Sequence, residues 1–185
     1  MIKYKVGDVT NPEPPAHGVT IIVHCCNDIG VMGGGVALAL AKKWPGVYDE
    51  YDRWYADDHY HDRDSLPYRH QHDPFVLGQI QLVNVDPNSE VWVCNLIGQR
   101  DVQPYLGLPP VRYEAIREGL RRLANKLTRS AKYPPSNFNI VMPRIASGLA
   151  GGSWQAVEPI IQEELKDFDI TVYDIIPVDG TNYDE

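Results

Sequence analysis

Short apolar runs alternate with amphipathic segments along most of the chain. Runs rich in Val and Ile that end at Gly, Pro, Asn or Asp predict strands. Apolar residues that recur every three or four positions predict helices, most clearly over residues 113–130. On this basis we predict strands over residues 2–6, 21–24, 80–85, 91–97, 139–142 and 170–176, and helices over residues 36–43, 47–55, 113–130 and 154–165.

The order of these elements indicates one α/β domain. Strands and helices interleave, and the turn residues at 86–89 join the third and fourth strands as a hairpin. We therefore expect a three-layer α/β/α fold with a mixed central sheet and helices on both of its faces. The chain of 185 residues fits a single domain, 1–178, followed by a polar tail over 179–185.

The segment 57–74 departs from this pattern because it is rich in Asp and His. Carboxylate and imidazole groups bind metals, so a metal site is one interpretation. The spacing matches no ligand motif, and we therefore predict a solvated surface insertion without a metal.

The composition narrows the class of partner. A net charge of −8 disfavours broad binding to nucleic acid, which depends on clusters of Lys and Arg. No apolar run is long enough to span a membrane, and three cysteines (Cys25, Cys26 and Cys94) are too few for a disulfide framework. We expect a soluble cytoplasmic protein in which the cysteines act as small buried side chains.

The most informative stretch of the chain is 20–40. An apolar strand ends near His24 and Asn27, three glycines follow at 33–35, and a helix begins at Val36. Glycine lets a ligand approach the backbone closely, and the N–H groups at a helix N-terminus attract anions. This arrangement predicts a ligand that carries phosphate and is held mainly by main chain, with His24 and Asn27 at its edge.

A second glycine-containing loop occupies residues 143–152. It follows the strand predicted over 139–142 and leads into the helix predicted over 154–165. In open α/β sheets, ligands bind in a crevice at the carboxyl ends of the strands. We therefore expect the two loops to hold one ligand between them.

Three motifs together resemble the macrodomain family, and the resemblance covers essentially the whole chain. They are GDVT at 7–10, VHCCNDIGVMGGGVA at 23–37 and MPRIASGLAGG at 142–152. The resemblance implies ADP-ribose binding, with Asp8 and Val9 at the adenine and Asn27 at the distal ribose. For Asp8 and Asn27, turn formation is the alternative role. The remaining residues that it implies at the distal ribose and the diphosphate are Gly33, Gly34, Gly35, Val36, Ser147, Gly148, Leu149, Ala150 and Gly151.

The residues around His24 resemble one branch of that family, in which two activities occur. One is a phosphatase of ADP-ribose 1″-phosphate, and the other removes ADP-ribose from glutamate through a lysine and an aspartate. The corresponding positions here hold Gln99 (or Arg100) and Ala150, and neither Gln99 nor Ala150 can supply that chemistry. We therefore expect a hydrolase of the phosphatase type, with ADP-ribose or ADP-ribose 1″-phosphate as its ligand.

His24 and Asn27 are the predicted catalytic residues. An imidazole titrates near neutrality, so His24 is the candidate acid–base group, while Asn27 would orient the distal ribose or a water. Asp101 is a further candidate for proton transfer. If His24 only satisfies a backbone carbonyl, the chain is a non-catalytic ADP-ribose reader. A third function is release of ADP-ribose from modified protein or nucleic acid. The motifs imply no metal and no cofactor, and the oligomeric state is not predicted.

Overall fold

The central sheet has six strands in the order β1-β6-β5-β2-β4-β3. The computed structural model describes residues 2–15, 18–60, 73–88 and 90–175. The strands pair in parallel, except that β3 and β4 form the predicted antiparallel hairpin. The predicted mixed sheet is therefore confirmed. Its strands are β1 (Ile2–Val6), β2 (Val19–Asn27), β3 (Ile80–Asp86), β4 (Val91–Gln99), β5 (Phe138–Met142) and β6 (Asp169–Asp174).

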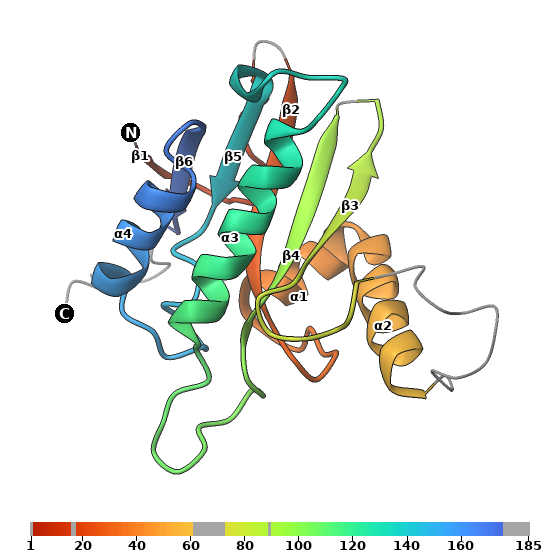
Figure 1. The fold of residues 1–185 in the computed structure, drawn as a ribbon, viewed down its shortest axis with the longest axis vertical. Coiled ribbons are helices and arrows are strands. Elements are labelled where there is room, and N and C mark those ends of the chain that lie inside the picture. Colours follow the sequence, from red (N-terminus) through yellow and green to blue (C-terminus); the bar gives the residue numbers. More distant parts are fainter. Residues whose placement is uncertain (1, 16–17, 61–72, 89, 176–185) are drawn as a thin grey trace.

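Helices cover both faces of the sheet, as a three-layer fold requires. In Figure 1, α3 and α4 lie over one face, and α1 and α2 lie over the other. Two separate apolar clusters match this division, one beneath each pair of helices. No helix within the described ranges is long and apolar enough to cross a membrane. The helices are α1 (Gly35–Lys43), α2 (Pro45–Tyr60), α3 (Tyr113–Thr128) and α4 (Trp154–Glu164), with a 3₁₀ turn at Pro135–Asn137.

Strand β2 is the centre of the sheet. It pairs with β4 on one side and β5 on the other, and every residue of it except Cys25 is buried. Burial on both faces explains why its sequence is a nearly continuous apolar run. The prediction that this strand ends at His24 was wrong, because pairing with β4 extends it to Asn27. His24 thus lies inside the strand.

Helix α2 is longer than predicted at both ends. It begins at Pro45, whose fixed φ and missing N–H suit the first turn of a helix. It continues to Tyr60, so residues 57–60 of the predicted surface insertion are helical. The remainder of that insertion over 61–72, and the predicted tail over 179–185, lie outside the described residues.

The three cysteines behave as the sequence predicts. Cys26 and Cys94 are buried, Cys25 is partly buried, and all three are free thiols. Burial raises the pKa of both Cys25 and Cys94 to about 12, so their thiolate forms are disfavoured at neutral pH. These side chains therefore serve packing.

Candidate functional site

Three loops meet where the parallel strands end. We call residues 28–34, after β2, the first loop, residues 143–153, after β5, the second loop, and residues 100–112, after β4, the third loop. Because β1, β6, β5, β2 and β4 run in the same direction, their carboxyl ends share one edge of the sheet, at the lower end in Figure 1. A ligand site built from loops is expected at this edge.

Asn27 fixes the shape of the first loop. Its Oδ1 accepts hydrogen bonds from the N–H groups of Ile29 and Val31, both at 3.2 Å. Its Nδ2 donates to the Val31 carbonyl oxygen at 2.6 Å, and the Tyr51 hydroxyl donates to the Asn27 carbonyl oxygen. Gly30 has a φ of 75° and packs against the Tyr55 ring. The turn-forming role of Asn27 is therefore present, with the loop held by several contacts.

The first loop ends at an uncapped helix N-terminus. Gly34 precedes α1 in an extended conformation, and no side chain caps the helix. The first helical hydrogen bond runs from the Leu38 N–H to the Gly34 carbonyl oxygen. The N–H groups of Gly35, Val36 and Ala37 reach no acceptor among the described residues. These donors and the helix dipole make this position suitable for an anion.

The second loop presents a similar set of donors. Two internal hydrogen bonds of 2.8 Å close it, from the Gly151 N–H to the Gly148 carbonyl oxygen and from the Gly152 N–H to the Ala146 carbonyl oxygen. Glycine is required at 152, because a Cβ there would lie 2.5 Å from the Ala146 oxygen. The N–H groups of Gly148, Leu149 and Ala150 have no acceptor within the described part of the chain.

The first and second loops face each other directly. Leu149, with 76% of its surface exposed, extends over the first loop. A Cβ added at Gly34 would lie 3.0 Å from the Leu149 Cδ1, and one added at Gly35 would lie 3.6 Å from it. Beside this contact, Gly33 and Gly148 border open space, since a Cβ on either would meet nothing within 4 Å. The structure thus brings together the two loops that the sequence predicts to share one ligand.

Asp8 and Val9 lie at the end of β1, on the far side of the same edge. The Asp8 Oδ1 accepts a hydrogen bond from the Thr10 N–H at 2.8 Å, and its Oδ2 has no partner among the described residues. Val9 is buried in the same apolar cluster as Met32 of the first loop and Leu40 of α1. Asp8 is therefore both a turn residue and an available acceptor at one end of the loop cluster.

His24 lies beneath the loops rather than on them. It is 1% exposed, and its Nε2 lies 2.6 Å from the Asn95 Oδ1. The Asn95 Nδ2 donates to the Gln81 Oε1 at 2.9 Å, so the Asn95 oxygen is the acceptor and His24 carries its proton on Nε2. Burial lowers the pKa of His24 from 6.5 to about 4, which keeps the ring neutral at neutral pH. The hydrogen-bond partner of His24 is therefore a side chain, and not the backbone carbonyl considered from the sequence.

The free energy of unfolding is expected to decrease when the pH is lowered, because of His24. Since its pKa is 6.5 in the unfolded chain and about 4 in the fold, only the unfolded chain binds this proton between those values. Protonation of His24 has no effect on stability above that window, and it lowers the free energy of unfolding by about 2 kcal/mol at pH 5. Urea unfolding at pH 7.5 and pH 5 measures the fall. His24→Gln keeps a donor for Asn95 but does not titrate, so its fall should be smaller; equal falls in both proteins would contradict the prediction.

The third loop connects the other two. The Asp101 N–H donates to the Asp28 Oδ1 at 2.7 Å, and the Val111 N–H donates to the Ala150 carbonyl oxygen at 3.0 Å. Gln99 is buried at the end of β4, and its Nε2 donates to the Asp101 carbonyl oxygen. The third loop therefore holds the first and second loops in a fixed relation.

Sequence reasoning missed Asn95, Gln81 and Asp28. Asn95 and Gln81 interrupt apolar strands, and that interruption was the available signal. The contacts of Asn95 with His24 and with Gln81 depend on strand register, in which Asn95 lies opposite both of them. Asp28 follows Asn27 directly, and its contact with the third loop joins residues far apart in the sequence.

The described residues form no candidate metal centre. Within the described ranges, no group of three or more His, Cys, Asp or Glu side chains is arranged to hold a metal ion. Most of the His- and Asp-rich segment lies outside those ranges.

Comparison with known proteins gives similarity over nearly the whole chain, although no protein-family model matches it. A macrodomain protein from Streptomyces coelicolor is 37% identical, with 94% of this chain and 99% of that one covered and a TM-score of 0.70. A structure of a protein of unknown function from Bacteroides thetaiotaomicron is 38% identical, with coverage of 95% and 98% and a TM-score of 0.76. The ADP-ribose 1″-phosphate phosphatase of Saccharomyces cerevisiae is 24% identical over 94% of this chain and 98% of its own.

Proposed function

Because the chain belongs to the macrodomain family, we propose that it binds ADP-ribose at its three loops and hydrolyses the terminal phosphate of ADP-ribose 1″-phosphate. The observation that carries the proposal is the approach of Leu149 to Gly34 and Gly35, which brings together two loops that each carry free N–H donors. Main-chain N–H groups can bind a diphosphate even on a chain whose net charge is −8.

Each part of the ligand has a matching part of the site. In this proposal Asp8 and Val9 meet the adenine, and the free N–H groups of residues 148–150 hold the diphosphate. The first loop and the start of α1 surround the distal ribose. The hydrogen bonds of Asn27 within the first loop support a role in shaping this wall of the site.

Cleavage of a phosphate monoester requires neutralised charge at the phosphate and a proton for the leaving oxygen. The prediction that His24 supplies this proton stays a prediction, and its burial and low pKa weigh against direct transfer. We propose instead that His24 is a positioning residue that joins β2 to Asn95 beneath the first loop. The phosphatase reaction is supported by the named activity of the Saccharomyces cerevisiae relative.

The alternative function is that of a non-catalytic ADP-ribose reader. It is favoured by the burial of His24 and by the engagement of the Asn27 side chain within its own loop. Release of ADP-ribose from modified protein has less support, because Ala150 cannot supply the missing carboxylate. A cytoplasmic location is proposed from the three free thiols, which suit a reducing compartment.

One experiment separates these functions. The protein is offered ADP-ribose 1″-phosphate, mono-ADP-ribosylated protein and free ADP-ribose, with products followed by chromatography and binding by calorimetry. We expect binding of ADP-ribose and release of phosphate from the first substrate alone. Binding without turnover would identify a reader, and no binding at high micromolar concentration would contradict the whole proposal.

A further inference from the structure

A hollow beside the first loop has no part of the ligand assigned to it so far. Its volume is about 310 Å³, and it lies between the end of α2 and the start of the third loop. The residues that line it are Asp28, His59, Phe75, Val76, Leu77 and Arg100.

Packed aromatic rings line this hollow next to the first loop. The His59 ring stacks on the Tyr55 ring, with centroids 4.1 Å apart, and the Phe75 ring meets the edge of Tyr55 at 5.2 Å. Tyr55 also packs against Gly30, where an added Cβ would lie 2.6 Å from the ring. The hollow therefore lies directly beside the first loop, because Asp28 of that loop lines it and Tyr55 packs against both Gly30 and His59.

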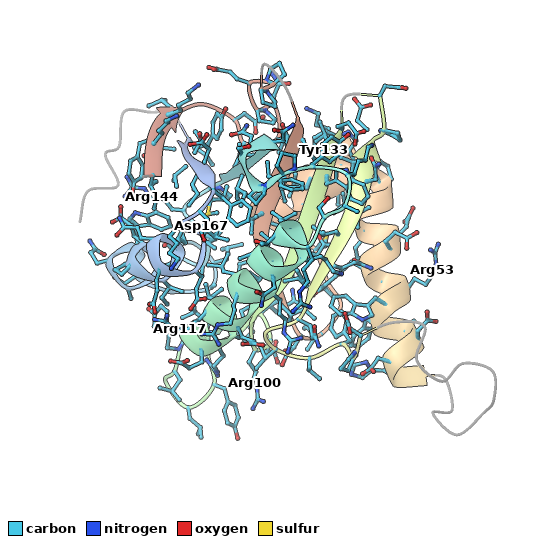
Figure 2. The ribbon with its side chains drawn as sticks, turned by 45° about the horizontal axis from the view of Figure 1, so that its top comes forward. Arg53, Arg100, Arg117, Tyr133, Arg144 and Asp167 are labelled. Atoms are coloured by element: carbon cyan, nitrogen blue, oxygen red, sulfur yellow. The ribbon has the colours of Figure 1, made fainter. Side chains whose placement is uncertain are left out.

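Arg100 is the cation at the rim of this hollow. Its backbone N–H donates to the Pro110 carbonyl oxygen, which fixes its main chain. Its Nε lies 3.8 Å from the Asp28 Oδ2, and its side chain is 64% exposed. Its two terminal amino groups meet no acceptor among the described residues. In Figure 2, Arg100 projects from the loop end of the molecule, whereas Arg53 projects from the outer side of α2.

We propose that this hollow is the subsite for the group carried on the distal ribose, and that Arg100 binds a phosphate monoester there. The inference rests on the proposed function, because it takes the first loop as the wall around the distal ribose. A guanidinium can donate two parallel hydrogen bonds to phosphate. An exposed ion pair as long as that with Asp28 is weak, so a doubly charged phosphate can displace it.

The arrangement makes Arg100 a specificity-determining residue. ADP-ribose itself presents only a hydroxyl at this position and leaves Arg100 near Asp28. ADP-ribose 1″-phosphate exchanges that contact for a stronger, charge-assisted one. Asp28 keeps a second task, since its Oδ1 accepts the Asp101 N–H and holds the third loop in place.

Calorimetry with two ligands tests the inference independently of turnover. The ligands are ADP-ribose and an analogue whose 1″-phosphate is a non-hydrolysable methylenephosphonate. The wild-type protein should bind the analogue more tightly. Arg100→Gln should weaken binding of the analogue about tenfold or more, and binding of ADP-ribose less than twofold. Asp28→Asn, which keeps an acceptor for Asp101, should strengthen binding of the analogue.

Arg53→Gln is the matched control, because Arg53 is similarly exposed at 59% and is paired with Glu50. It should change neither affinity. If Arg100→Gln weakens both ligands equally or neither, or if the wild type prefers ADP-ribose, this inference is overturned while ADP-ribose binding stands. If the wild type binds neither ligand, the proposed function itself has failed.

Discussion

Replacing Gly148 or Gly33 with Val is expected to abolish ADP-ribose binding and leave the fold intact. A Cβ at either position meets nothing within 4 Å, and neither residue has a positive φ, so the fold itself does not require glycine. The new side chain would project into the open space beside these loops, where the proposal places the ligand. We expect affinity for ADP-ribose to fall about 100-fold or more, since steric overlap and lost phosphate contacts together cost several kcal/mol.

Calorimetry measures this loss, and thermal unfolding checks the fold. Gly46→Val is the control, because Gly46 lies in α2 and its Cβ would also meet nothing within 4 Å. All three variants should melt within about 2 °C of the wild type, as open-surface substitutions do. If Gly148→Val binds ADP-ribose normally, the ligand does not lie between these loops.

Asn95→Leu is expected to be the most destabilising polar substitution in the centre of the sheet. Asn95 is 0% exposed, accepts from His24 and donates to Gln81. Its loss leaves the His24 N–H buried without an acceptor, which should lower the free energy of unfolding by about 2–4 kcal/mol. Urea unfolding at pH 7.5 measures the effect.

The double variant His24→Leu/Asn95→Leu provides the control. Removing both partners of a buried hydrogen bond is less costly than removing one, so the double variant should be more stable than Asn95→Leu alone. The corresponding double-mutant cycle should give a coupling energy of about 1 kcal/mol or more. If the two substitutions are simply additive, His24 and Asn95 do not stabilise each other.

The sequence predicts the order of elements and the layers well, because these depend on hydrophobic periodicity. It misplaces the ends of strands and helices where those ends depend on contacts with other parts of the chain. Pairing with β4 carries β2 on to Asn27, beyond its apolar run. Stacking of Tyr55 on His59 accompanies the final turn of α2, where the Asp and His content had indicated a loop.

The candidate site likewise has features that can be predicted from the sequence and features that cannot. The two glycine-containing loops and their shared edge follow from local patterns and from the direction of parallel strands. The burial of His24 does not, because it depends on the register that places Asn95 beside His24 and Gln81 beside Asn95. Arg100 acquires its proposed role only through a hollow that the aromatic residues of α2 help to form.

The most direct test of the account is phosphorus NMR of ADP-ribose 1″-phosphate incubated with the protein. The monoester and the diphosphate give separate signals, so the bond that breaks is identified. We predict that the monoester signal is replaced by inorganic phosphate while the diphosphate signals remain, and that Gly148→Val prevents the change. An unchanged spectrum, or loss of the diphosphate signals, would contradict the account.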